Sequence, residues 1–439
     1  MPFQLNPDFN QDVEKHFDTL QVHAGYSPDP VTGSAALPIY ASAAFEFSDA
    51  EDGALKFALA RPGNVYGRLT NTTTDAVAAR IAAIEGGTGA VAVASGHAAE
   101  ILALTNLVGA GDEIVASDSL YGGTWNIFLH TLGDLGVKTT FVENNDIDAF
   151  VAATTPKTKL WYVETIGNPL VDVADVPAIV EAANSLPSPV PVFVDNTFAT
   201  PYLYRPAEDG AAVVIESLTK WIGGHGATLG GAVVDTGKFD WKQDPDKWST
   251  LAKPDPSYHG LVFADAAPAA PFATRVLANK LRDFGPTLSP YAAQLIGLGI
   301  EDLSLRVQRH ADNALAVAKY LESNPKVEWV RYSGLENDPS HEVASRILKH
   351  GFGGVVVFGV KGGREAGLNV VSNVKLFTHL ANVGDAKSLI IHPASTTHSQ
   401  LTKEQLEEAH LSEDLVRLSV GIEDVDDIIA DLDQAIEKA

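Results

Sequence analysis

Seven short apolar runs between residues 89 and 235 constrain the fold of this chain more than any other feature. Most of them are rich in valine and isoleucine, and longer segments separate them: GAVAVAS, DEIVAS, VKTTFVE, KLWYVE, VPVFVD, AAVVIES and GGAVVD. This pattern is typical of strands buried on both faces and joined by helices. It predicts an α/β fold with a large, mainly parallel sheet. Ligands of such sheets bind beyond the carboxyl ends of the strands, so the residues that follow these runs are the first candidates for a site.

The flanking segments predict the remaining organisation. Residues 1–69 have frequent proline and glycine and weak periodicity, which indicates an irregular N-terminal arm. Residues 70–290 are expected to form the large domain, which begins with a helix over TTTDAVAARIAAIE. Within it, the polar and aromatic segment from Phe239 to Phe263 indicates an insertion beyond the sheet. A long helical stretch is expected from about Ala270 to Ser323. Residues 291–439, which include its second part, hold three further apolar runs that predict a smaller α+β C-terminal domain: VEWVRY, GGVVVFGV and LVRLSV.

Composition argues against several classes of function. The chain has 56 Asp and Glu against 31 Lys and Arg, a formal net charge of −25, which disfavours nucleic-acid and anionic-membrane partners. It has no cysteine, so disulfides, thiolate metal sites and cysteine nucleophiles are excluded. No run of about 20 apolar residues is present to span a membrane. The N-terminus lacks the apolar core of a signal peptide, so a cytoplasmic location is expected.

An acid and a lysine follow two of the central runs. Asp195 ends PVPVFVD, and Lys220 follows AAVVIESLT. A lysine that forms a Schiff base and a carboxylate that pairs with the pyridinium nitrogen are what a pyridoxal phosphate (PLP) site requires. Taken singly, each residue is more often an ordinary charged strand end.

Other turns beside the predicted sheet offer supporting groups. Ser95-Gly96-His97 enters a helix and leaves backbone N–H groups free for a phosphate, and the hydroxyls of Ser217 and Thr219 suit phosphate oxygens. Tyr121 precedes two glycines that allow a flat ring to approach and stack on it, although it could equally be a core residue. Arg417 lies inside the apolar run LVRLSV. Its fork suits a substrate α-carboxylate, and an internal salt bridge is the alternative.

Other cofactor and metal sites find little support. The glycines of GHGATLGG have the wrong spacing for a dinucleotide fingerprint and precede a strand, and no phosphate-binding P-loop motif occurs. The histidines His379, His392 and His398 have neither the spacing nor the carboxylate partners of a metal site. No metal is therefore expected.

Taken together, these residues resemble the Cys/Met-metabolism family of PLP-dependent enzymes. The resemblance runs from about Thr19 to the C-terminus and rests on an ordered set of motifs: VYGRLTN, ASGHAA, LYGGTW, ETIGNP, VDNTFATP, ESLTKWIGGHG, GDAKSLIIHPASTTHSQL and VRLSVGIED. It implies a fold-type I, aspartate-aminotransferase-like subunit that shares active sites within a dimer, commonly doubled to a tetramer.

The resemblance also implies roles for individual residues. Lys220 would bind PLP covalently and act in catalysis, with Asp195 on the pyridinium nitrogen and Tyr121 stacked on the ring and assisting acid–base steps. Asn168 would lie beside the phenolic oxygen. Several groups would bind the phosphate, the last two of them from a neighbouring subunit: Gly96, His97, Ser217, Thr219, Tyr66 and Arg68. Arg417 and the backbone of Asn382 and Val383 would hold the substrate carboxylate, with Tyr66 nearby.

Within the family, ETIGNP, GGHGATLGG and ANVGDAKSL resemble the branch that acts on O-acetylhomoserine. That resemblance implies γ-replacement of acetate by sulfide to give homocysteine, in methionine biosynthesis. The alternatives are a cystathionine γ-synthase, a sulfhydrylase of O-succinylhomoserine or O-acetylserine, and a PLP-binding protein without activity. Two positions depart from the family pattern: His97 stands where this branch usually has Gln, and Asn71-Thr72-Thr73 replaces N-P-T.

Overall fold

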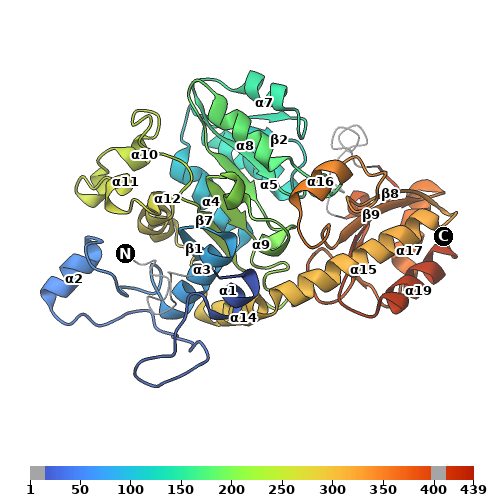
Figure 1. Ribbon diagram of the computed structural model, residues 1–439, viewed down its shortest axis with the longest axis horizontal. Coiled ribbons are helices and arrows are strands. Elements are labelled where there is room, and N and C mark those ends of the chain that lie inside the picture. The colour runs from blue at the N-terminus through green and yellow to red at the C-terminus, as the bar shows by residue number, and fades with distance from the viewer. Residues whose placement is uncertain (1–14, 397–411) are drawn as a thin grey trace.

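The computed structural model describes residues 15–396 and 412–439, and it contains two sheets (Figure 1). The larger sheet has the strand order β1-β7-β6-β5-β4-β2-β3. Six of the strands run in the same direction, and only β7 runs in the opposite direction. The seven strands coincide with the seven apolar runs: β1 (Gly89–Val93), β2 (Glu113–Ser117), β3 (Lys138–Val142), β4 (Thr158–Glu164), β5 (Val192–Asp195), β6 (Val213–Glu216) and β7 (Gly231–Asp235). The prediction of a mainly parallel α/β sheet is therefore confirmed.

Helices cover both faces of this sheet. One face packs against α3 (Thr72–Glu85) and α8 (Val176–Ser185), and the other packs against α4 (Gly96–Leu107) and the π-helix η4 (Val276–Leu281). Successive side chains of a strand point to opposite faces. Tyr162 and Phe193 belong to the core on the α4 side, so Glu164 and Asp195, two residues further along their strands, also face α4. By the same alternation Glu216 follows Val214 and faces α3.

Shorter helices complete the large domain. Those between the first strands and the insertion are α5 (Gly122–Asn126), the π-helix η1 (Ile127–Thr131), α6 (Leu132–Asp134), α7 (Ile147–Ala153), α9 (Thr200–Leu203) and the 3-10 helix η2 (Pro206–Asp209). The expected long helical stretch from residue 270 is interrupted at Gly285, which has a φ of 77°. It consists of α12 (Pro271–Arg275), η4, α13 (Arg282–Phe284), α14 (Pro290–Glu301) and α15 (Leu303–Ser323).

The smaller domain is built on a five-stranded sheet with the order β10-β11-β12-β9-β8. Helix α15 runs from the large domain along this sheet (Figure 1). Three strands coincide with the predicted runs, and the two shortest were not anticipated: β8 (Val327–Arg331), β9 (Val355–Val360), β10 (Thr378–His379), β11 (Leu389–Ile391) and β12 (Leu415–Ser419). Its helices are α16 (His341–Ile347), α17 (Gly363–Asn373), the 3-10 helix η5 (Pro393–Ser395) and α19 (Val425–Ile436).

The sequence predicts that the segment from Phe239 to Phe263 lies beyond the sheet, but the structure packs its aromatic residues into the core. Trp241 and Trp248 are buried in the core on the α4 side, and the ring of Trp241 stacks on Phe272 with centroids 5.5 Å apart. The segment is polar on average, but its aromatic residues are directed inward. It includes α10 (Ser249–Ala252) and the 3-10 helix η3 (Pro256–Tyr258), and α11 (Phe263–Ala266) follows.

The N-terminal arm is less irregular than expected. It contains α1 (Phe17–His23), which packs on α3 and α14, and α2 (Ala50–Phe57). The part that carries α2 projects from the body of the large domain (Figure 1). Within the described residues, no helix combines the length and apolar character that a membrane span needs.

Candidate active site

Most of the predicted site residues lie at, or shortly after, the carboxyl ends of parallel strands of the larger sheet. His97 follows β1, Tyr121 follows β2, Asn168 follows β4, Asp195 ends β5 and Lys220 follows β6. The smaller domain adds Asn382 and Arg417 through direct side-chain hydrogen bonds. The structure therefore brings these residues together at the edge of the sheet where ligands of such folds bind.

Lys220 presents a reactive amine to this site. Its Nζ donates a hydrogen bond to Oδ1 of Asn382 at 2.7 Å. Burial lowers the pKa of the Lys220 amine to about 8, and the positive charge of Arg417 adds to the effect. A lysine with this pKa is neutral far more often near neutral pH than an ordinary lysine, and the neutral amine is the nucleophile that attacks an aldehyde.

Asp195 is a half-buried carboxylate at the end of β5. Its Oδ1 accepts a hydrogen bond from the backbone N–H of Thr197 at 2.9 Å. Burial raises the pKa of the Asp195 carboxyl, and bonding to the side chain and backbone of Thr197 opposes that rise. Within the part of the chain that the structure describes, no Lys, Arg or His forms an ion pair with it. A protonated ring nitrogen would supply the missing positive charge.

The start of α4 forms a cradle beside Ser217. Ser95 caps the helix by accepting from the backbone of Ala98 at 3.1 Å, and the N–H groups of Gly96 and His97 have no partner within the helix. A Cβ on Gly96 would lie only 2.7 Å from Cβ of Ser217, so only glycine permits this close approach. The arrangement suits a phosphate group. The Thr219 hydroxyl also bonds to the backbone of Gly230, donating to its carbonyl and accepting from its N–H.

The rings of Tyr121 and His97 lie against each other. Their ring centroids are 5.6 Å apart and their planes are inclined by 30°. Tyr121 is 45% exposed, so it is not the core residue of the alternative interpretation. A Cβ on Gly123 would lie 2.4 Å from the Tyr121 ring and 2.5 Å from Nε2 of His97, which explains the glycine. Burial lowers the pKa of His97, and the nearby charge of Lys220 lowers it further.

Arg417 extends from β12 into the site and is buried. Its Nη1 donates to Oδ1 of Asn168 at 2.9 Å. No carboxylate of the described residues lies within ion-pair distance, so the internal salt bridge considered for this residue does not form there. Burial lowers the pKa of Arg417 to about 10. The guanidinium has donors to spare for a substrate carboxylate.

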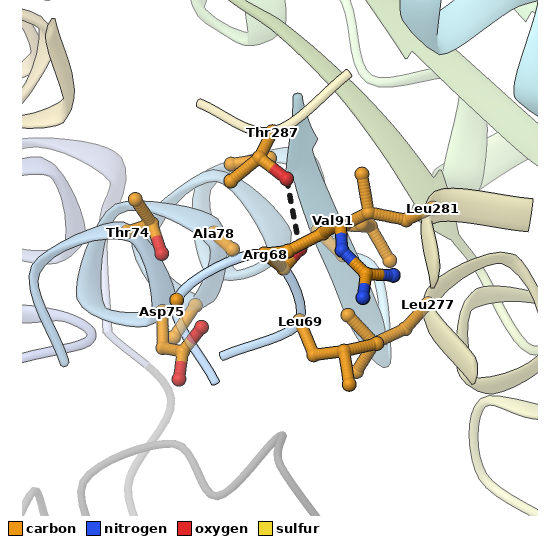
Figure 2. A pocket seen from close by; sticks show the side chains of 13 residues that line it. Arg68, Leu69, Thr74, Asp75, Ala78, Val91, Leu277, Leu281 and Thr287 are labelled. Carbon is orange, nitrogen blue, oxygen red and sulfur yellow. Dashed lines mark hydrogen bonds between the residues drawn. The ribbon is translucent and has the colours of Figure 1, made fainter. Parts of the chain in front are cut away.

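Tyr66 and Arg68 lie elsewhere in the subunit. The Arg68 guanidinium is 5.5 Å from the ring centre of Tyr66 and bonds to the carbonyl of Arg282. Figure 2 shows Arg68 beside Leu277, Leu281 and Thr287, whose hydroxyl donates to the Arg68 carbonyl at 2.8 Å. Among the described residues, neither side chain bonds to Lys220 or Asp195. Within one subunit, Tyr66 and Arg68 therefore make no hydrogen bond to the lysine or the acid of the site.

The histidines singled out in the sequence have separate surroundings. His392 is buried and bonds to the Ser395 hydroxyl and the Glu413 carbonyl, which makes it structural. His379 is exposed in β10, and His398 lies outside the described residues. In residues 15–396 and 412–439, no cluster of three or more His, Asp or Glu side chains could hold a metal ion.

Two contacts were missed from the sequence. The Asn382 side chain, rather than its backbone alone, reaches the site through Lys220. Glu164 accepts the backbone N–H of Tyr121 at 2.7 Å. The sequence does place Glu164 at the end of a predicted strand, in ETIGNP. Because the carboxyl ends of parallel strands meet at one edge, that position could have identified it as a site residue.

Comparison with known proteins agrees with this geometry. Residues 18–437 match the family model of Cys/Met metabolism PLP-dependent enzymes. The homocysteine synthase of Schizosaccharomyces pombe is 48% identical over 97% of this chain and 99% of its own length. The O-acetyl-L-homoserine sulfhydrylase 1 of Thermus thermophilus is 47% identical over 96% of this chain and 99% of its own.

A solved structure has the same fold over nearly the whole chain. It is the O-acetylhomoserine (thiol)-lyase of Campylobacter jejuni, which carries pyridoxyl-lysine phosphate. It superposes with a TM-score of 0.92, is 37% identical, and the match covers 96% of this chain and 100% of the other.

Proposed function

The chain belongs to the Cys/Met metabolism family of PLP-dependent enzymes, and we propose that it replaces the acetate of O-acetyl-L-homoserine with sulfide. The products are L-homocysteine and acetate, and the reaction serves methionine biosynthesis. One observation carries the proposal: the ends of β5 and β6 present a half-buried carboxylate, Asp195, and a lysine with a lowered pKa, Lys220, which has the buried guanidinium of Arg417 nearby, and among the described residues neither Asp195 nor Arg417 forms an ion pair. This set accepts a cationic ring on one side and an amino-acid carboxylate on the other.

The residues present fit PLP. Lys220 would hold it covalently, Asp195 would pair with its ring nitrogen, and Tyr121 would stack on its ring. Its phosphate would lie against the N–H groups of Gly96 and His97 and the Ser217 hydroxyl. Bound there, PLP supplies an electron sink that stabilises negative charge at Cα of an amino acid.

The side chains of the chain then have defined tasks. Arg417 binds the substrate carboxylate, and Asn168 orients the guanidinium from the other side. The amine of Lys220 removes the proton from Cα and moves protons between Cα and Cβ. The Cγ–O bond breaks as acetate leaves, a C–S bond forms at Cγ, and the proton transfers run in reverse. Sulfide needs little space, so a narrow pocket would exclude larger thiols.

The active form is a dimer that shares its sites and pairs into a tetramer in the cytoplasm. The support is that, among the described residues, neither Tyr66 nor Arg68 bonds to Lys220 or Asp195 of its own subunit, while Tyr66 is 44% exposed. An exposed apolar row on α14 and the start of α15 offers further surface for association: Tyr291, Leu295, Leu298 and Leu305.

An assay panel tests the reaction. Purified protein with PLP would receive O-acetylhomoserine, O-succinylhomoserine or O-acetylserine, each with sulfide or cysteine, and products would be separated and quantified. Homocysteine from O-acetylhomoserine and sulfide, at the highest kcat/KM of the panel, is expected. Preference for cysteine would indicate a cystathionine γ-synthase, and the absence of homocysteine would overturn the proposal.

Subunit mixing tests the shared site. Arg68→Ala and Lys220→Ala proteins would each be nearly inactive, and their co-refolded mixture would regain activity only if Arg68 serves the partner subunit's site. Light scattering would report dimer or tetramer.

A further inference from the structure

Glu164 occupies a central position that none of the assigned roles uses. It is the last residue of β4 and the register partner of Asp195 on β5. Paired residues of neighbouring parallel strands point to the same face, so the two acids lie side by side on the α4 face. Glu164 is 6% exposed, and no cation pairs with it within the described residues.

The carboxyl of Glu164 joins two loops of the site. Its Oε1 accepts the backbone N–H of Tyr121 at 2.7 Å, and the backbone of Asn168 lies near enough to this carboxyl to oppose the rise in its pKa. Tyr121 begins α5 without any side-chain cap, and its ring is half exposed, so the ring depends on its backbone for its position. Asn168 in turn holds the guanidinium of Arg417.

The electrostatic surroundings of the Glu164 carboxyl favour its neutral form, which can still accept hydrogen bonds. Burial raises the pKa of Glu164 well above its ordinary value, and the neighbouring charge of Asp195 raises it further. A neutral carboxyl still accepts N–H hydrogen bonds through its carbonyl oxygen. Glu164 can therefore hold both loops without placing a second negative charge beside Asp195.

We propose that Glu164 is a positioning residue, whose carboxyl fixes the Tyr121 ring and, through Asn168, the Arg417 guanidinium relative to Asp195. The inference rests on the proposed PLP site but not on the identity of its substrate. It assigns one residue control over both the ring that covers the cofactor plane and the group that binds the substrate carboxylate.

Two conservative variants separate the effect of the length of the Glu164 side chain from the effect of its ability to ionise. Glu164→Gln keeps an acceptor oxygen at the same distance and cannot ionise, whereas Glu164→Asp keeps the acid but withdraws it by one methylene. We expect the Gln variant to remain within about threefold of wild type in kcat/KM. We expect the Asp variant to lose roughly tenfold or more, chiefly through KM for the amino-acid substrate, because a buried hydrogen bond is left unmade.

A second readout is independent of turnover. The visible circular dichroism band of bound PLP reports how the protein holds the ring, and it should change in the Asp variant and remain in the Gln variant. Glu100→Asp is the matched control. Glu100 is equally buried in α4 and senses the charge of Asp195, but among the described residues it accepts only from the Thr124 hydroxyl at 3.5 Å. Its dichroism and KM should stay at wild-type values.

Opposite results would overturn the proposal. These are an unchanged dichroism band and KM in Glu164→Asp, a larger loss in Glu164→Gln than in Glu164→Asp, or equal changes in Glu100→Asp. If wild-type protein binds PLP but makes no homocysteine, the proposed reaction fails, while the dichroism comparison still decides the role of Glu164.

Discussion

The amine of Lys220 donates a hydrogen bond to the side-chain oxygen of Asn382 at 2.7 Å, which links the large domain to the smaller one at the centre of the site. The bond joins the loop after β6 to the segment between β10 and β11. Asn382 accepts from this amine without adding a charge, and the pKa of Lys220 is about 8 beside it. The neutral amide therefore leaves the lysine free to lose its proton.

Replacing this amide with a carboxylate should raise the pH at which the apoprotein captures PLP at half its maximal rate. In Asn382→Asp the new negative charge stabilises the ammonium form, so the pKa of Lys220 should rise from about 8 by roughly one unit or more. Only the neutral amine attacks the PLP aldehyde. The pH at which apoprotein captures PLP at half its maximal rate, followed by absorbance, should increase accordingly. Asn382→Ser serves as the control, and an unshifted midpoint in the Asp variant would contradict the assignment.

Arg417 should affect both substrate affinity and the lysine. Arg417→Met removes the guanidinium that faces Asn168, so KM for the amino-acid substrate should rise about 10- to 100-fold. It also removes a positive charge that lowers the pKa of Lys220, so the midpoint of PLP capture should move to higher pH. Arg364→Met is the comparison, since Arg364 is exposed and 3.7 Å from Glu413. Unchanged KM in Arg417→Met would exclude carboxylate binding by this residue.

Asp195 should control turnover more than cofactor content. Asp195→Asn is close in shape but removes the negative charge opposite the ring nitrogen. Lys220 and the α4 cradle should still retain PLP, whereas kcat should fall roughly 100-fold or more, because a charge that stabilises the reacting state is lost. PLP content and kcat measured on the same preparation would check this. Full turnover in the Asn variant would show that the ring nitrogen has another partner.

The sequence predicts the sheet well because its strands are buried on both faces. Continuous apolar runs such as VPVFVD identify such strands without help from tertiary contacts. The two-residue strand β10 has no comparable signal, and its pairing with β11 fixes it instead. The insertion was misplaced because average polarity conceals Trp241 and Trp248, whose burial depends on the helices above them.

The same distinction applies to the site. Lys220, Asp195 and Arg417 could be proposed from charged residues at the ends of or within apolar runs. The contact between Lys220 and Asn382 joins residues 162 positions apart, and no local pattern encodes it. Glu164 was overlooked because a single acid at a strand end is usually solvated, and only the strand register places it beside Asp195.

A buried pair of acids on the opposite face should make stability depend on pH. Glu216, which faces α3, and Glu85 at the end of that helix are buried together, and Asn196 bonds to Glu85 at 3.2 Å. Burial raises the pKa of Glu216, and the charge of Glu85 raises it further. A folded-state pKa above the unfolded value means that this stability is complete at acidic pH and is lost as pH rises through the folded pKa.

Glu216→Gln removes the group that must stay protonated, so its advantage over wild type should grow with pH. Urea unfolding at pH 6 and pH 9 should give a free energy of unfolding that falls less for the variant, with a difference of about 1 kcal/mol or more. Glu336→Gln, at an exposed position, should follow wild type at both values. If wild type and Glu216→Gln lost the same free energy of unfolding between pH 6 and pH 9, the Glu85–Glu216 pair would not be the group that titrates.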